Sequence, residues 1–513
     1  MVRFRKALCL AVALLMVAML VFTTGCTGTK EEKAESSKKT EETSGTEEKK
    51  VEEALQPVTL KWYFGYAAVD KDREQVFSKM NEIIKEKINA TVEFNVVDFS
   101  QWSDKINVLL SSGENIDISW HNWVMSYAAN VSKGMYKPLD DLLAEYGKGI
   151  LNDIPKALLD IQRVNGKIYA IPNYQISTVQ NAYLLKKDVV DSLNFDVSSV
   201  KSYKDLGAYA ELVKSKFSDL FPLMNRQGIL WGQHLREIEW ELVIKGIGNP
   251  LAVKYGDTDK KVFNMYATED FKEYCELVHE WYNKGYIRED VATVTNAAAE
   301  TKAGKYATIA GGTLKYPGAY AAETKAQVGY DLVEAITSRS LWESTAGQAT
   351  MNTIPSSSKN PERAMMLLNL LNDDQELANL FAYGFEGTHY EKLDNGQIKR
   401  IKDSGYDFNW QWAVLNTFKI YLTDNFPVNH NEQILKTHAD SVPSNIAGFV
   451  ANTEPFLTEL TQCQTAYNEI GLGLQTGVLD PKEYLPKFLD TLERAGVNKI
   501  LTEVQKQIDQ QLK

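Results

Sequence analysis

The first folded part of the chain alternates between two hydrophobic periods. Residues 58–64 place apolar side chains at every second position, which predicts a strand, and residues 72–89 carry them at the spacing of an amphipathic helix. Residues 91–97 and 116–120 predict two further strands, with a predicted helix at 102–110 between them. This alternation predicts an α/β domain with a largely parallel sheet, in which ligands bind at the carboxyl ends of the strands.

A turn signal stands farther along the chain. Asn165 and Gly166 separate two short runs that favour strands. An Asn-Gly pair suits the two-residue turn whose backbone twist matches that of a hairpin, because both positions need a positive φ. The sequence therefore predicts a β-hairpin here.

The N-terminus has the pattern of an export signal. Three basic residues precede an apolar run at 7–22, which is short for a spanning helix and is followed by small residues. Residues 1–25 are therefore predicted to be a cleavable signal peptide. Gly25-Cys26 resembles a bacterial lipobox, in which a lipidated cysteine becomes the mature N-terminus, so we expect a lipid on Cys26. Plain secretion is the alternative.

Residues 26–57 predict a disordered, charged linker. Between residues 30 and 53 nearly every side chain is Lys, Glu, Ser or Thr, and none is aromatic. Such a segment buries too little apolar surface to fold, and its mixed charges keep it solvated. We expect it to hold the folded body clear of the membrane.

The net charge and the cysteine content exclude some classes of partner and of site. The formal net charge is -12, which argues against nucleic acid as a partner, because binding phosphates requires a basic surface. Outside the signal and the lipobox only Cys275 and Cys463 remain, and we expect two free, partly buried thiols. Neither belongs to a CxxC pair, so no zinc or redox site is predicted.

Aromatic residues gather at or just after the ends of the predicted strands. A residue that serves only the core is expected within the strand, so these rings are candidates for the rim of a ligand cleft. They are Trp62, Tyr63, Tyr66, Trp120 and Trp123.

No catalytic motif accompanies them. The 6 histidines do not form an HExxH pair or another close zinc-ligand set, and the chain has no GxSxG elbow, P-loop or GxGxxG loop. Two carboxylates suffice for a glycosidase, and Glu343 with Glu386 is the candidate pair, so an enzyme stays open as an alternative. Binding without turnover, with no metal and no cofactor, is the simpler interpretation.

Several segments, taken in their order along the chain, resemble one known family. Residues 112–118, 134–143, 165–172 and 354–364 resemble turns and hairpins of the extracellular solute-binding proteins of family 1, the maltodextrin-binding type used by ABC importers. Residues 384–390, with the sequence GFEGTHY, and residues 494–500 resemble a lipoprotein subgroup, LipO-like. Members of that subgroup carry an additional C-terminal domain of unknown function.

This resemblance implies an α/β fold of the two-lobed, type II periplasmic-binding-protein kind, a clamshell with a hinge of crossing segments near 171–179 and 307–312. The expected parts are a first lobe, a second lobe and a helical C-terminal extension packed on the clamshell. Their expected boundaries are 58–172 with 312–352, 173–311 with 353–440, and 441–513.

The resemblance also implies a function. We expect a monomeric, lipid-anchored substrate-binding protein on the outer face of the cell membrane, which captures a saccharide, in particular an oligosaccharide, and delivers it to the transmembrane subunits of an ABC permease. A surface lipoprotein that senses its ligand for a kinase is the alternative, since it requires the same clamshell.

Candidate ligand-binding residues combine flat aromatic rings, which can stack on a sugar, with polar side chains that bind its hydroxyl groups. The first set is Trp62, Tyr63, Trp120, Asn122, Trp123, Tyr174, Gln175, Tyr316, Trp342, Glu343 and Glu386. Asn173 is a further polar candidate, and Trp231, Trp240, Trp410 and Trp412 are second choices.

Overall fold

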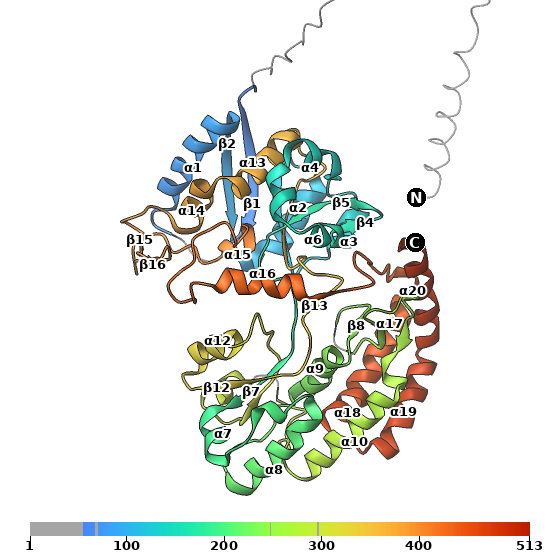
Figure 1. Ribbon diagram of the computed structural model, residues 1–513. Helices are drawn as coiled ribbons and strands as arrows, with labels where there is room; N and C mark the ends of the chain where they lie inside the picture. Colours follow the sequence, from blue (N-terminus) through green and yellow to red (C-terminus); the bar gives the residue numbers. More distant parts are fainter. Residues whose placement is uncertain (1–54, 67–69, 247, 295–296, 513) are drawn as a thin grey trace, which may run out of the picture. The chain divides into compact units, whose positions relative to one another are not determined.

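The computed structural model describes residues 55–66, 70–246, 248–294 and 297–512 (Figure 1). The predicted signal peptide, Cys26 and nearly all of the predicted linker lie outside the described residues. Residues 55–513 form one compact unit. Across the described ranges, no helix is both long and apolar enough to cross a membrane.

One mixed sheet organises the first half of the molecule. Strands β1 (Val58–Gly65), β2 (Ala90–Val97) and β3 (Ile118–Asn122) are parallel, and β14 (Thr350–Thr353) runs antiparallel between β3 and β6 (Ala170–Pro172). The order is β2-β1-β3-β14-β6. The three predicted strands are confirmed, and the carboxyl ends of β1 and β3 lie at one edge of the sheet.

The helices of this half follow from their apolar faces. Helix α1 (Arg73–Ile88) buries Val76, Phe77, Met80 and Ile84 against β2 and ends at Asn89, whose φ of 44° is a left-handed cap. Helix α2 (Trp102–Ser112) covers the region predicted as helical. Both helix predictions are therefore confirmed.

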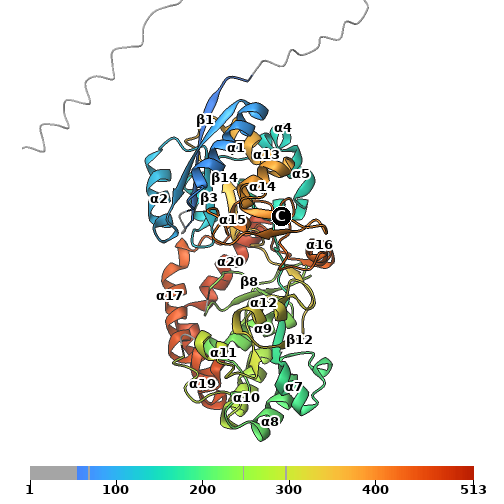
Figure 2. The same ribbon diagram turned by 90° about the vertical axis from the view of Figure 1, so that its left-hand side faces the viewer.

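A later part of the chain completes this core. Helices α13 (Pro361–Asp373) and α14 (Gln375–Tyr383) pack against α1, α4 (Asp140–Tyr146) and α5 (Lys148–Asp153) (Figure 2). Residues from Ile354 to Ile420 share one hydrophobic core with β1 and β3. The expected assignment of 353–440 to the second lobe therefore differs from the packing, because the apolar faces of α13 and α14 fit the first core.

The second half is built around a smaller sheet. Strand β7 (Ala182–Lys186) lies between β11 (Thr308–Ile309) and β12 (Leu332–Ile336), both antiparallel to it. Because β12 pairs with β7 while β14 joins the first sheet, the expected first-lobe segment 312–352 is divided between the two halves.

Helices extend the core of this half, and their buried side chains pack in one cluster with Tyr183 and Leu185 of β7. The main ones are α8 (Leu206–Lys216), α9 (Ile229–Glu237) and α10 (Glu269–Asn283).

Four C-terminal helices belong to the second half. They pack against α10 and against each other, and their buried side chains share the core of that half (Figure 1, Figure 2). The helices are α17 (Leu457–Ala466), α18 (Leu472–Thr476), α19 (Pro481–Arg494) and α20 (Val497–Gln511).

Three chain segments cross between the two halves. Val179 forms a bridge with Leu341, and β13 (Leu341–Trp342) pairs in parallel with β17 (Val442–Pro443), which follows helix α16 (His430–Asp440). The second crossing therefore lies between β12 and β14, and not near 307–312 as expected, because Thr308 and Ile309 are part of the β7 sheet. The three crossings lie side by side.

Candidate functional site

A cavity of about 730 Å³ opens beside the crossing segments. Its walls come from the connection that follows β3, from the first crossing at 173–179, from the second crossing at 343–350 and from residues 243–245 of the second half. Residues 449–453, which follow β17, supply a further wall. The cavity thus combines segments that lie hundreds of positions apart in sequence.

Neutral polar side chains are numerous in the walls, beside apolar ones such as Met125 and Ile176. Hydroxyl and amide side chains converge on the cavity from the first half, the crossings and the second half, where they can donate and accept hydrogen bonds. They include Ser126, Asn173, Gln175, Ser177, Thr178, Thr313, Ser344, Thr345 and Gln348.

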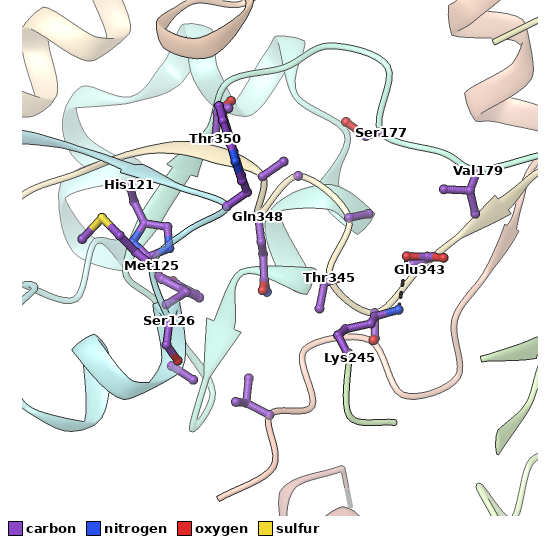
Figure 3. A pocket seen from close by; sticks show the side chains of 18 of the residues that line it. His121, Met125, Ser126, Ser177, Val179, Lys245, Glu343, Thr345, Gln348 and Thr350 are labelled. Atoms are coloured by element: carbon purple, nitrogen blue, oxygen red, sulfur yellow. Dashed lines mark hydrogen bonds and ion pairs between the residues drawn. The ribbon is translucent and has the colours of Figure 1, made fainter. Parts of the chain in front are cut away.

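The charged residues of this cavity are paired. Lys245 Nζ lies 3.1 Å from a carboxylate oxygen of Glu343 (Figure 3). Lys315 Nζ lies 2.6 Å from Glu323. Burial lowers the pKa of His121 to about 3, so this imidazole is neutral at physiological pH. A ligand in this cavity therefore meets no wall residue whose charge lacks an opposite partner.

The Lys245–Glu343 pair belongs to a larger network. Buried Glu241 accepts hydrogen bonds from the Ser344 amide at 2.6 Å and the Ser444 hydroxyl at 2.5 Å, and it lies 3.4 Å from Lys245 Nζ. Burial alone raises the pKa of Glu343, but the positive charges of Lys245 and Arg236 outweigh it, so the net shift is downward. This network joins the second half to the second and third crossings.

Trp123 supplies an aromatic face at the cavity. The residue directly follows β3, lines the cavity and is 48% exposed. Its ring stacks on Trp412 with centroids 5.8 Å apart and planes 22° apart, and Phe99 lies on another side at 5.3 Å. The ring is therefore held in place while much of its surface stays open.

A second cavity, of about 520 Å³, adjoins the first. The two share Lys245 and Glu343 as wall residues, so the ion pair stands between them. Trp231 and Trp240, both second-choice candidates, line this second cavity. Tyr467 and Gln475 of the C-terminal helices line it as well.

Three of the first-choice candidates meet at the large cavity. Trp123, Gln175 and Glu343 all line it, and so does Asn173. Trp410 and Trp412 lie behind Trp123, with their ring centroids 6.2 and 5.8 Å from its ring. The position after a strand end was the sequence signal that singled out Trp123.

Other strand-end candidates lie inside the first core. Trp62 and Trp120 are fully buried, the former against Phe381 of α14, and Tyr63 is 8% exposed. Asn122 is buried, and its side chain caps the following turn by accepting the Val124 amide at 3.1 Å.

The remaining candidates lie near α16 or at the surface. The Tyr174 hydroxyl and the Trp342 indole both bond to His438, while the Tyr316 hydroxyl lies 2.6 Å from His430 Nδ1. Glu386 is exposed and pairs with Lys392 at 2.6 Å. The carboxylate pair imagined for a glycosidase therefore does not meet in the large cavity, since only Glu343 lines it.

Sequence reasoning missed several wall residues. Lys245, Ser126, Ser177 and the segment 449–453 lie in irregular connections with no local motif. Only the crossing of three distant segments brings them together. Within the described ranges, no group of three or more His, Cys, Asp or Glu side chains is arranged to hold a metal ion, and Cys275 and Cys463 are buried and unpaired.

Comparison with known proteins identifies relatives along nearly the whole chain. A carbohydrate ABC transporter substrate-binding protein of Streptococcus pneumoniae serotype 4 is 27% identical over 480 residues, which cover 92% of this chain and 94% of the relative. The crystal structure of the N-glycan transport solute-binding protein NgtS from Streptococcus pneumoniae is 26% identical and has a TM-score of 0.75, covering 89% of this chain and 99% of that one.

More distant structures share the fold. A solute-binding protein associated with an HMO-binding ABC transporter, from Bifidobacterium longum infantis, is 15% identical with a TM-score of 0.61, covering 88% of this chain and 99% of that one. Residues 445–513 match a family described as a domain of unknown function (DUF3502). Residues 70–378, more than half of the chain, match the family described as bacterial extracellular solute-binding proteins. The chain therefore belongs to the bacterial extracellular solute-binding proteins and has their type II periplasmic-binding fold.

Proposed function

We propose that this protein is the extracytoplasmic binding component of an ABC importer and that its cargo is an uncharged oligosaccharide. The observation that carries the proposal is the cavity of about 730 Å³, whose walls combine many hydroxyl and amide groups with the open face of Trp123. A pyranose ring needs both kinds of contact, because its hydroxyl groups form hydrogen bonds while its C–H face packs on an aromatic ring.

Two features support a neutral, extended cargo. The charged wall residues are already paired with opposite charges, so an anionic sugar would have to compete with Glu343 or Glu323. The NgtS chains that were crystallised with Man1GlcNAc and with Man5GlcNAc are each 25% identical to this chain. Both ligands are neutral oligosaccharides, and they are the probes that we would use first.

The three crossings support a hinge. Each is a short connection beside the cavity, and among the described residues the two cores on either side share no regular sheet other than the narrow β13–β17 pair. We infer that saccharide binding favours a closed arrangement of the two halves, which the transmembrane subunits of the permease recognise.

Anchoring completes the proposal. The sequence of residues 1–25, the lipobox-like Gly25-Cys26 and the charged linker support lipidation on Cys26 and tethering to the outer face of the cell membrane. Mass spectrometry of the membrane-extracted protein tests this part, since a diacyl or triacyl mass on an N-terminal Cys26 peptide is expected.

The saccharide is tested by calorimetry and thermal unfolding. The protein used begins at residue 27, which leaves the compact unit 55–513 intact. We expect saturable binding of Man5GlcNAc or Man1GlcNAc, stabilisation by about 2.7 kcal/mol at 100 times the dissociation constant, and recovery of the sugar uncleaved. A uronic-acid oligosaccharide is the charged control.

A matched pair of variants locates the site. Trp123→Ala should weaken binding about tenfold, because it removes the open ring, whereas Trp123→Phe should retain most of the affinity. If none of the saccharides tested binds to the parent protein, the proposal is contradicted. Cleavage of the bound sugar would indicate an enzyme instead.

A further inference from the structure

We propose that the C-terminal domain, residues 445–513, is a functional part of the saccharide site and not only a support for the second half. Its segment 449–453, called here the wall segment, forms one side of the large cavity, and α20 fixes the backbone of this segment through Gln507 and Gln511. The inference rests on the proposed saccharide-binding function and assigns a role to a domain whose function is unknown.

The wall segment reaches the cavity with several residues. Phe449, Val450, Ala451 and Thr453 all line it, and Phe449 is only 4% exposed because it also packs into the second core. The segment lies between β17 and α17 and has no helix or strand of its own. Its backbone polar groups therefore need partners from elsewhere.

Two glutamines supply those partners. Gln507 accepts the Asn452 amide at 2.8 Å and donates to the Asn452 carbonyl at 3.0 Å, so one side-chain amide satisfies both backbone groups of one residue. Gln511 does the same for Val450, at 3.4 and 3.2 Å. Each glutamine thus takes the place that a neighbouring strand would occupy in a sheet.

The helix that carries them is itself firmly held. Gln507 and Gln511 are four positions apart and so lie on one face of α20. Val504 and Ile508, on the adjoining face, are buried in the second core, and Gln507 is only 7% exposed. A buried side-chain amide without hydrogen-bond partners lowers the stability of the folded protein. Loss of the two bonds between Gln507 and Asn452 is therefore unfavourable, and these bonds keep the wall segment in place.

The C-terminal domain also borders the second cavity. Tyr467 lies in the π-helix Tyr467–Gly471, a rare local geometry that often marks functional sites, and its hydroxyl donates to Gln475 Oε1 at 2.9 Å. Both side chains line that cavity. A Cβ on Gly248 would lie 2.7 Å from the Tyr467 ring, and one on Gly228 would lie 2.5 Å from Gln475, so the domain is pressed closely onto the loops of this cavity.

A purely structural role predicts something different. If the domain only stabilised the second core, loosening or filling the wall segment would lower the melting temperature without altering which saccharide binds. If the wall segment contacts the cargo, the same changes alter the dissociation constant, and the ratio of affinities for two glycans, in protein that remains folded.

Two pairs of variants, made in the chain that begins at residue 27, separate these roles. Gln507→Met removes both bonds to Asn452 at nearly constant size, and Gln510→Met changes an exposed position on the same helix. Ala451→Trp fills the cavity, and Leu457→Trp adds an indole ring at an exposed position of α17 outside the wall segment and the lining. Calorimetry with Man1GlcNAc and Man5GlcNAc, melting temperatures, and hydrogen exchange of residues 449–453 are measured for each protein.

We expect Gln507→Met to weaken glycan binding about tenfold, because two neutral hydrogen bonds are lost, and to speed hydrogen exchange in the wall segment. Ala451→Trp should abolish measurable binding of the larger glycan, whereas both control variants should bind like the parent protein.

The outcomes are separable. If the parent binds glycan and Ala451→Trp binds both glycans equally well, the role of the C-terminal domain is refuted while the proposed function stands. If the parent binds no saccharide, the proposed function fails and this inference fails with it. Should Gln507→Met not fold, Ala451→Trp and its control decide the question.

Discussion

Lys245 is a positively charged residue that lines both cavities. Its ammonium group lies between Glu343, at 3.1 Å, and the buried Glu241, at 3.4 Å. Burial lowers its pKa, but the two carboxylates outweigh that effect, so the net shift is upward and the group is charged at neutral pH. Lys245 therefore compensates two acids at the junction of the second half with the crossings, and Arg236, 3.9 Å from Glu343, adds a further positive charge.

We predict that Lys245→Met lowers the free energy of unfolding by about 1–2 kcal/mol at neutral pH. The removal leaves Glu241 and Glu343 without their shared cation, which is costly for the buried carboxylate, although the partial exposure of Lys245 and Glu343 moderates the loss. Urea unfolding measures it.

The exposed Lys392–Glu386 pair provides the control, and Lys392→Met should leave the unfolding midpoint nearly unchanged. Because the net pKa shift of Glu343 is downward, the contribution of its ion pair is present above the ordinary value of 4.5 and is lost as the pH falls below it. Equal midpoints for Lys245→Met and the parent at pH 7 would contradict this prediction.

Single residues show what the sequence can and cannot predict about the site. The sequence treats Trp62, Trp120 and Trp123 alike, at or just after the ends of predicted strands, whereas in the structure Trp62 and Trp120 lie within β1 and β3. Trp62 is buried because α14 places Phe381 against it, while Trp123 stays open at the cavity. The difference arises from a helix some 300 residues away, which no local pattern in the sequence contains.

At the scale of elements, local sequence patterns were sufficient to predict individual helices and strands. The strands β1 to β3, the helices α1 and α2, and the Asn165-Gly166 hairpin, with φ values of 51° and 79°, agree with the sequence. Each is determined by spacing or turn chemistry within a few residues. The core that α13 and α14 join was predicted wrongly, because an amphipathic face shows that a helix is buried and does not show which partner buries it.

Helix α16 contacts the first crossing through one buried side chain, His438. His438 is 5% exposed, its Nε2 accepts the Ser177 amide at 3.1 Å and its Nδ1 lies 3.0 Å from the Tyr174 hydroxyl. Nε2 must therefore be unprotonated, which places the single ring proton on Nδ1. Burial lowers the pKa of His438 to about 4 from an ordinary value of 6.5.

This shift predicts an acid-sensitive contact between α16 and the first crossing. The unfolded chain binds a proton at His438 below about pH 6.5, whereas the folded protein does so only near pH 4, so stability falls as the pH decreases between these values. The contribution is about 3 kcal/mol over the full window.

The measurement is the free energy of unfolding as a function of pH for the parent and for His438→Asn. The variant should show a flatter profile between pH 6.5 and 4, whatever its stability at pH 7, because one titrating group has been removed. Parallel profiles would indicate that His438 is protonated at the same pH in the folded and unfolded chains.

At the scale of the whole molecule, the three crossings connect the two cores and determine the angle between the two halves. Val179, Leu341 and Val442 lie side by side through the 179–341 bridge and the β13–β17 pair. The third crossing leads directly into the wall segment, so a change in the angle between the halves also moves a wall of the cavity. Cargo that touches both halves and the wall segment would favour one angle over the others.

We therefore predict that Man5GlcNAc makes the protein that begins at residue 27 more compact in solution and slows hydrogen exchange in the three crossings. Small-angle X-ray scattering should record a smaller radius of gyration at saturating glycan, because a ligand can shift the equilibrium only by binding the closed form more tightly. Trp123→Ala serves as the control, since at the same glycan concentration it should be less occupied and therefore less compact. If the radius of gyration is unchanged at calorimetrically verified saturation, binding and closure are not coupled, and the permease would have to recognise the loaded protein through the cavity rim itself.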